Sequence, residues 1–139
     1  MNVKYSVIIP VYNAELYLEE CLLSLQKQSF TECEFIVWND GSTDKSAQII
    51  QKFVSDKRFR VFEDENRGAS LARQHAVNVS KGKYILFLDS DDMVSEKMLE
   101  TIDSIMDDSI DLLQYQSSEN IERMRKDESF QWEVYDKTM

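Results

Sequence analysis

The chain has 139 residues, of which 42% are hydrophobic, so it is long and apolar enough for one folded domain and is not disordered. Because it contains 3 glycines and 1 proline, we exclude collagen-like chains and turn-dense all-β folds. Its net charge of −10 repels nucleic-acid phosphates and its basic clusters are small, so we expect no nucleic-acid binding.

The first predicted strand is followed directly by the first predicted helix. Residues 5–10 form a β-branched run that ends at Pro10, which is typical of a buried parallel strand. Residues 14–28 have helical spacing, and we expect Asn13 to cap this helix. One apolar stripe runs along the helix and consists of Leu18, Cys21, Leu22 and Leu25.

The middle of the chain repeats this alternation. The sequence predicts a strand over residues 33–38, a helix over residues 45–55 and a third strand over residues 59–62. The apolar face expected for the helix consists of Ala47, Ile50, Phe53 and Val54.

The last regular part of the sequence follows the same pattern. Residues 68–80 predict a helix with His75 on its inner face, which we interpret as a core histidine and not as a ligand. Residues 84–88 form the strongest predicted strand, residues 95–106 a helix and residues 110–116 a last strand. Strands that alternate with helices indicate an α/β fold with a mostly parallel sheet.

Three polar loops follow predicted strands, at residues 10–13, 39–44 and 89–92. In an open α/β sheet, ligands bind beyond the carboxyl ends of the strands, so we expect these loops to share one ligand-binding rim. A phosphoacceptor receiver domain needs an acidic pair after the first strand, and a dinucleotide dehydrogenase needs a glycine-rich turn there. The first loop provides neither, which excludes both classes.

The acidic loop is the most specific of the three. The carboxylates of Asp89, Asp91 and Asp92 repel one another unless a cation lies between them. Mg²⁺ and Mn²⁺ prefer oxygen ligands, and Mg²⁺ is usually held by one or two carboxylates together with substrate phosphates. The loop therefore fits a metal–diphosphate site.

Each loop also has an interpretation without a ligand. The acidic loop can be a turn in which Asp92 or Ser95 caps the next helix. Residues 39–44 can be a glycine turn in which Ser42 or Thr43 caps a helix, and Tyr12 can stack on a base or cover the edge of the sheet.

Taken together, the loops carry a family resemblance. Four motifs occur in order, at residues 6–13 (Ser-Val-Ile-Ile-Pro-Val-Tyr-Asn), 39–44 (Asn-Asp-Gly-Ser-Thr-Asp), 66–73 (Asn-Arg-Gly-Ala-Ser-Leu-Ala-Arg) and 88–92 (Leu-Asp-Ser-Asp-Asp). They resemble family 2 of the inverting glycosyltransferases, which have the GT-A fold. The resemblance implies a Rossmann-like, three-layer αβα sandwich with a mostly parallel sheet, truncated after about the fifth strand.

The resemblance also implies a ligand, a nucleotide-diphospho-sugar and most often a UDP-sugar. By position, Pro10, Tyr12 and Asn13 would lie against the base, and Asp40 would accept a hydrogen bond from the uracil N–H. Family members often have Asp where this chain has Asn39, a difference with little expected effect because Asp40 is the residue that touches the base.

The same resemblance implies that the remaining motif residues contact the phosphates and the sugar of the nucleotide-sugar. Asn66 and Arg73 would border the ribose and the diphosphate. Asp89 and Asp91 would approach the ribose and the sugar, and Asp91 and Asp92 would bind Mg²⁺ or Mn²⁺.

The resemblance divides the chain into two parts. Residues 1–116 would be the nucleotide-sugar-binding domain, and residues 117–139 the start of the acceptor half or an irregular tail. The general base is expected beyond Met139, so no catalytic residue is assigned. The implied reaction transfers the sugar with inversion to the hydroxyl of a saccharide or lipid-linked acceptor, in cell-surface polysaccharide or glycoconjugate synthesis.

Several expectations concern the protein as a whole. We expect Cys21 and Cys33 to be buried thiols in a cytoplasmic protein without a signal peptide, with attachment to the inner face of the membrane left open. The competing hypothesis is a non-catalytic interaction domain that forms homo-oligomers through an uncovered apolar surface.

Overall fold

The structure is a computed structural model that describes residues 2–106, 113–114 and 133–134. Four parallel strands form its main sheet, in the order β3-β2-β1-β4. These strands are β1 (Tyr5–Val11), β2 (Cys33–Asp40), β3 (Phe59–Asp64) and β4 (Tyr84–Phe87). The helices are α1 (Leu18–Gln26), α2 (Ser46–Gln51), α3 (Ala69–Val79) and α4 (Met98–Ile105).

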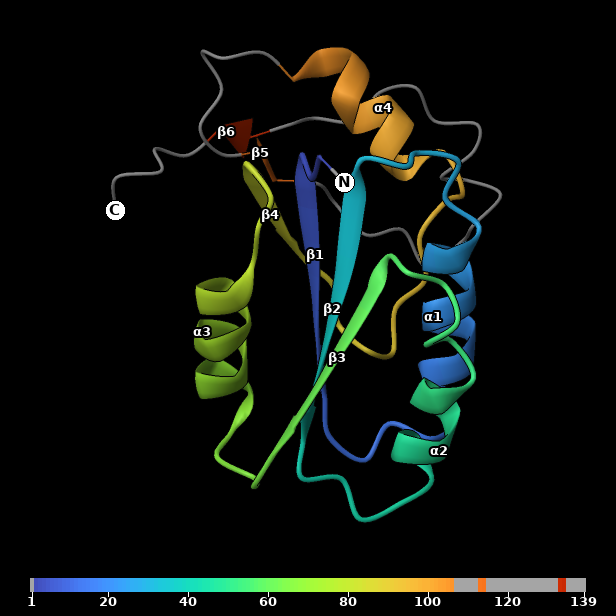
Figure 1. Ribbon diagram of the computed structural model, residues 1–139, viewed down its shortest axis with the longest axis vertical. Helices are drawn as coiled ribbons and strands as arrows, with labels where there is room; N and C mark the ends of the chain where they lie inside the picture. The colour runs from blue at the N-terminus through green and yellow to red at the C-terminus, as the bar shows by residue number, and fades with distance from the viewer. Residues whose placement is uncertain (1, 107–112, 115–132, 135–139) are drawn as a thin grey trace.

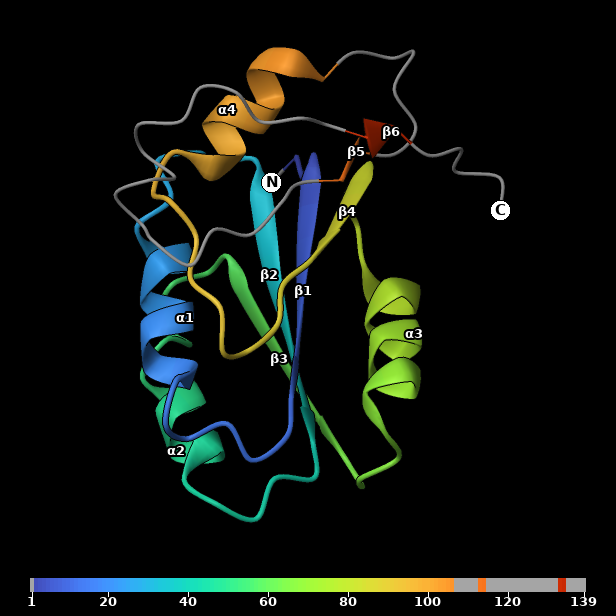
Figure 2. The ribbon, with the colours of Figure 1, turned by 180° about the vertical axis from the view of Figure 1, so that it is seen from behind.

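The elements form three layers. Figure 1 and Figure 2 show α1 and α2 on one face of the sheet and α3 on the other, whereas α4 lies near the amino ends of the strands. The predicted α/β fold with a parallel sheet is therefore confirmed. In the described part of the chain, none of the helices has the length and apolar character needed to cross a membrane.

The central strand β1 explains how one sheet serves two cores. All seven of its residues are buried, and successive side chains of a strand point to opposite faces. Val7, Ile9 and Val11 belong to the larger core beneath α1, α2 and α4. Ile8 belongs to the smaller core, where Ala72 of α3 packs against the sheet.

The apolar stripe predicted for the first helix is confirmed, but the cap is not. Leu18 and Leu25 are fully buried, as expected. The helix begins at Leu18 and not at residue 14, and Asn13 does not cap it. Residues 14–17 form a turn instead, in which the amide of Tyr17 donates to the carbonyl of Ala14. Asn13 has a φ of 47°, a left-handed conformation that leads into this turn.

Two predicted core residues lie farther out than expected. Val54 is 45% exposed because α2 ends at Gln51, before the helical face reaches this position. His75 is not a core histidine, since its side chain is 32% exposed. Its Nδ1 lies 3.7 Å from Oδ2 of Asp64, and its ring centre lies 5.4 Å from that of Trp38.

The last predicted strand is described only in part. The short strands β5 (Leu113–Gln114) and β6 (Glu133–Val134) pair with each other in antiparallel fashion, in a sheet separate from the main one. The other positions of the strand predicted over residues 110–116, and most of residues 117–139, lie outside the described residues.

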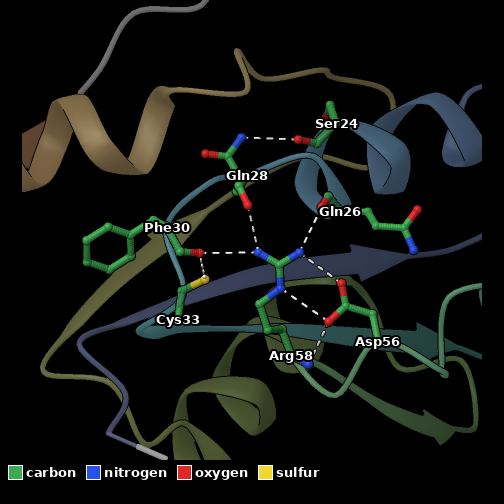
Figure 3. A network of polar contacts seen from close by, with 7 residues as sticks. All are labelled: Ser24, Gln26, Gln28, Phe30, Cys33, Asp56 and Arg58. Atoms are coloured by element: carbon green, nitrogen blue, oxygen red, sulfur yellow. Dashed lines mark hydrogen bonds and ion pairs between the residues drawn. The ribbon is translucent and has the colours of Figure 1, made fainter.

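The turn that joins α1 to β2 is held by Arg58 (Figure 3). Its guanidinium donates to the carbonyl oxygens of Gln26 at 2.7 Å, Gln28 at 2.8 Å and Phe30 at 3.2 Å. The carboxylate of Asp56 accepts a hydrogen bond from the same guanidinium at 2.9 Å. The hydrogen bonds from Arg58 to this carboxylate hold the pKa of Asp56 below its usual range. Arg58 thus supplies hydrogen-bond donors to carbonyls at and after the end of α1, where the backbone has no further helical N–H groups to bind them.

Candidate functional site

A pocket of about 460 Å³ opens at the carboxyl ends of the strands. Its lining comes from the end of β1 and the loop after it, the end of β2, the first turns of α3 and the loop after β4. This is the rim where the sequence predicted that three polar loops would meet. The structure brings all three to the same place.

Asn13 joins the first two loops. Its side-chain oxygen accepts hydrogen bonds from the amides of Thr43 at 2.8 Å and Asp44 at 3.3 Å. Its own amide donates to Oγ of Ser42 at 3.0 Å. The amides of Thr43 and Asp44 lie in the turn before α2 and not in the helix itself, which has no side-chain cap. Asn13 therefore ties the loop after β1 to the loop after β2 and caps neither helix.

Further bonds reinforce the same junction from both sides. The amide of Ala14 donates to Oγ of Ser46 at 3.0 Å, and the amide of Glu15 donates to Asp44 at 3.1 Å. In return, the amide of Lys45 donates to the carboxylate of Glu15 at 3.0 Å. The wall formed by the first and second loops is therefore a fixed surface.

Asp40, at the end of β2, joins the second loop to the segment before α3. Its carboxylate accepts from the amides of Arg67 at 2.9 Å and Gly68 at 3.0 Å, and the residue is only 4% exposed. The next residue, Gly41, has a φ of 72°, and a Cβ there would lie 2.6 Å from the amide nitrogen of Asn66. The backbone of this segment thus packs directly against the loop after β2.

Arg73 and Asp89 link the two sides of the pocket. Arg73 comes from α3 and Asp89 from the loop after β4, and their side chains form an ion pair at 3.3 Å. The side chains are 38% and 63% exposed, so both remain accessible to a ligand. A guanidinium here is suited to bidentate binding of phosphate oxygens.

The acidic loop forms a cluster that can hold a metal ion. Carboxylate oxygens of Asp89, Asp91 and Asp92 all lie within 4.8 Å of one another. Burial, followed by the charges of Asp91 and Asp89, raises the pKa of Asp92 above its usual range. Repulsion among the three carboxylates is the effect that the sequence predicted, and an oxygen-binding divalent cation would relieve it.

Cys21 lies beneath this cluster, a feature that the sequence did not reveal. The thiol is fully buried, and its Sγ donates weakly to the carbonyl of Asp89 at 3.7 Å. Burial, followed by the charges of the acidic loop, raises its pKa to about 12. Cys33 is also a buried free thiol, so the prediction of two buried thiols is confirmed.

Seven of the eight residues predicted to touch the nucleotide-sugar line the pocket: Pro10, Tyr12, Asn13, Asp40, Arg73, Asp89 and Asp91. The eighth, Asn66, packs beside Gly41 and is not part of the lining. Asp92 belongs to the acidic cluster without lining the pocket.

Sequence reasoning missed Tyr17, which also lines the pocket and is 55% exposed. The available signal was an aromatic residue four positions after Asn13, outside the apolar stripe of the helix.

Comparison with known proteins places these features in a family. The family model described as Glycosyl transferase family 2 matches residues 6–138. Glycosyltransferase GlyG of Streptococcus pneumoniae is 43% identical over 104 residues, which cover 73% of this chain and 35% of that protein. The poly(ribitol-phosphate) β-N-acetylglucosaminyltransferase TarS of Staphylococcus aureus is 38% identical over 109 residues, which cover 76% of this chain and 19% of that protein.

The structural comparison agrees. A crystal structure of S. aureus TarS 1–349 in complex with UDP-GlcNAc matches with a TM-score of 0.70 at 37% identity, over 73% of this chain and 30% of that chain. The predicted resemblance and the GT-A type of fold are thereby confirmed. The chain spans only 35% of the length of GlyG and 19% of that of TarS.

Proposed function

The chain belongs to glycosyl transferase family 2, and from this premise we propose that its pocket binds a nucleotide-diphospho-sugar, specifically a UDP-sugar. The observation that carries the proposal is the meeting of Arg73 and the acidic loop in one pocket with Tyr12 and Asp40. A cationic side chain and a potential metal cluster suit a diphosphate, and an aromatic side chain suits a base. TarS, a relative whose structure matches, has been crystallised with UDP-GlcNAc and with UDP.

The base would lie on the fixed wall of the pocket. Pro10, Tyr12 and Asn13 would contact it, and Asp40 would accept a hydrogen bond from the uracil N–H. The carboxylate of Asp40 already accepts two backbone amides, and a carboxylate has about four acceptor positions, so a third partner is compatible with its present bonds. Asp40 would then hold the pocket wall and the base at once.

The phosphates and the sugar would lie on the opposite side. Asn66 and Arg73 would border the ribose and the diphosphate, with Arg73 able to exchange Asp89 for a phosphate. Asp89 and Asp91 would approach the ribose and the sugar. Asp91 and Asp92 would hold Mg²⁺ or Mn²⁺, for which the closely spaced carboxylate oxygens are suitable ligands.

The proposed reaction is direct displacement at the anomeric carbon, with inversion. A divalent cation held by Asp91 and Asp92 would supply Lewis-acid stabilisation of the negative charge on the departing nucleoside diphosphate. The protein would contribute Arg73 as a second positive charge beside the same phosphates. The acceptor would be the hydroxyl of a saccharide or lipid-linked substrate in cell-surface polysaccharide or glycoconjugate synthesis.

In this proposal, residues 1–116 form the donor-binding domain, and residues 117–139 are the start of the acceptor half or an irregular tail. The general base that deprotonates the acceptor hydroxyl would lie in sequence beyond Met139. The 139-residue chain by itself should therefore bind the donor and show little or no sugar transfer.

Titration calorimetry tests the proposal directly. We expect wild-type chain to bind UDP more tightly with Mn²⁺ than with EDTA, and Asp92→Ala to lose this dependence on Mn²⁺. Glu96→Ala is the matched control, because it removes an exposed carboxylate from the segment after the acidic loop. Absence of UDP binding, or an Asp92→Ala variant that keeps the full Mn²⁺ effect, would overturn the proposal.

Sedimentation separates the proposal from the alternative of an oligomerising interaction domain. A donor-binding domain should stay monomeric with or without UDP. A stable oligomer that binds no UDP would favour the alternative.

A further inference from the structure

Three polar residues of α1 and the turn after it face the segment between β4 and α4. Cys21, Ser24 and Gln28 are spaced by three and four residues, so they lie on one side of the helix. All three are buried, with Ser24 6% and Gln28 4% exposed. In both ribbon views, the segment that leaves β4 runs alongside α1 before it reaches α4 (Figures 1 and 2).

These residues hold the acidic loop at both of its ends. The thiol of Cys21 donates to the carbonyl of Asp89, the first acidic residue, at 3.7 Å. Oγ of Ser24 accepts from the amide of Val94, two residues after Asp92, at 3.1 Å. The carboxylates of the cluster therefore project from a short stretch of chain anchored to two points one helical turn apart.

Gln28 continues the attachment beyond the loop. Its Nε2 donates to the carbonyl of Ser95 at 2.6 Å, and its Oε1 accepts from the amide of Leu99 at 3.1 Å. Nε2 also donates to the carbonyl of Ser24 at 3.1 Å, which ties the two anchors together (Figure 3). Arg58 in turn fixes the backbone of Gln28 through its carbonyl oxygen.

We propose that Ser24 and Gln28 are positioning residues for the metal and diphosphate site, an inference that rests on the proposed function. They set the spacing of the three carboxylates before a cation arrives. Without these anchors, repulsion would drive Asp89, Asp91 and Asp92 apart, and a cation would have to draw them together again. Residues that orient metal ligands without touching the metal act in this way.

A purely architectural role would have the same burial and the same bonds, so the test needs a matched structural control. Ser6 provides one at the opposite end of the sheet. Its buried Oγ donates to Glu34 at 2.8 Å and accepts from the amide of Gly82 at 2.8 Å. Ser24 likewise donates to an oxygen, the carbonyl of Cys21 at 2.6 Å, and accepts from a backbone amide.

The first experiment compares Ser24→Ala with Ser6→Ala in the full 139-residue chain. Both variants should lower the urea midpoint, because each removes a buried hydroxyl and leaves a backbone amide without its partner. Only Ser24→Ala should weaken Mn²⁺ binding, by about tenfold, the lower end of the effect known for groups behind metal ligands. Equal Mn²⁺ affinities in the two variants would overturn the inference.

A second variant keeps the inference testable if Ser24→Ala does not fold. Gln28→Glu keeps the shape and the acceptor for the amide of Leu99, but it places an oxygen against the carbonyl of Ser95 where Nε2 donated. We expect it to weaken Mn²⁺ binding as Ser24→Ala does, and a folded Gln28→Glu variant with wild-type Mn²⁺ affinity would overturn the inference.

Amide hydrogen exchange without metal tests the anchoring by itself. Ser24→Ala should accelerate exchange at Val94 and within the acidic loop, whereas Ser6→Ala should accelerate it at Gly82. A wild-type chain that does not bind Mn²⁺ would refute the proposed function. Unchanged exchange at Val94 in Ser24→Ala would instead refute the anchoring, so the two failures are distinguishable.

Discussion

The two ends of the main sheet treat acidic groups in opposite ways. At the amino end, Glu34 is 2% exposed, and both of its oxygens have partners. One accepts from Ser6 at 2.8 Å and from the amide of Lys81 at 2.7 Å, and the other accepts from Arg60 at 3.0 Å. At the carboxyl end, three carboxylates lie within 4.8 Å of one another, and Arg73 pairs with Asp89 alone among them.

This difference in charge compensation distinguishes a group that stabilises the fold from groups that can bind a ligand. A buried charge is tolerated when opposite charge and hydrogen bonds compensate it, as they do around Glu34. The acidic loop retains negative charge that the described residues do not balance, and this is an arrangement expected of a site that recruits a cation. Substitutions at the amino end should therefore affect stability, and those at the carboxyl end should affect ligand binding.

The largest expected effect is that of Glu34→Ala. The substitution removes the ion pair of Arg60, which keeps its hydrogen bond to the carbonyl of Val79, and leaves the amide of Lys81 without its partner. It should lower the free energy of unfolding by about 3 kcal/mol, the low end for breaking a buried pair. Urea denaturation measures this loss. The folded fraction should still bind UDP with Mn²⁺ at wild-type affinity.

The exposed strand residue Glu63 supplies the control, since Glu63→Ala should change the unfolding free energy by less than about 0.5 kcal/mol. A Glu34→Ala variant that is stable but loses UDP binding would break the distinction between the two ends.

Gly41→Ala sharpens the comparison at the carboxyl end. Gly41 has a φ of 72°, which strains any residue with a Cβ. The Cβ of an alanine at this position would lie 2.6 Å from the amide nitrogen of Asn66. We expect a loss of about 2 kcal/mol in unfolding free energy together with weaker UDP binding, since the loop after β2 would be displaced.

Gly68→Ala is the matched control for this steric argument. Gly68 has a φ of 100°, but a Cβ there would meet no atom within 4 Å among the described residues. The Gly68→Ala variant should lose only the free energy of unfolding that corresponds to backbone strain, about 1 kcal/mol. Equal losses in the two variants, measured by urea denaturation, would mean that contact with Asn66 contributes nothing.

The strand and loop order of the sheet could be predicted from the sequence because it depends on local patterns. The apolar runs around Ile8 and Ile36 and the stripe through Leu22 determine the layers, and the polar residues that follow mark the rim. The bonds between loops could not be predicted. Asn13 is a residue type that often caps the helix after it, yet its side-chain oxygen accepts from the loop after β2, because partners 30 residues away compete for it.

The role of α1 beneath the acidic loop was hidden for a related reason. Cys21 and Ser24 fit a buried helical face by periodicity, and nothing in the local pattern identifies the segment that they face. That partner lies 68 residues from Cys21 and 70 residues from Ser24 along the chain. Long-range pairing of this kind depends on the path of the chain after β4, which periodicity does not specify.

The smallest expected effect is also the most direct test of uncompensated charge. Without metal, Asp92→Asn should raise the unfolding free energy at pH 7 by about 0.5 kcal/mol, a size typical of exposed charge interactions. The pKa of Asp92 is raised in the folded state, first by burial and then by Asp91 and Asp89. Ionisation of Asp92 therefore costs the folded protein stability as the pH rises through this raised pKa.

The stabilising effect of Asp92→Asn should disappear as the pH falls through the same range, because wild-type Asp92 then binds a proton and the repulsion is relieved. Urea denaturation in EDTA between pH 7 and pH 4 measures the difference between the two proteins. Glu96→Gln, in the same segment, should show a nearly constant difference. A benefit that persists at low pH would mean that charge repulsion is not its source, and that the carboxyl end is as well compensated as the amino end.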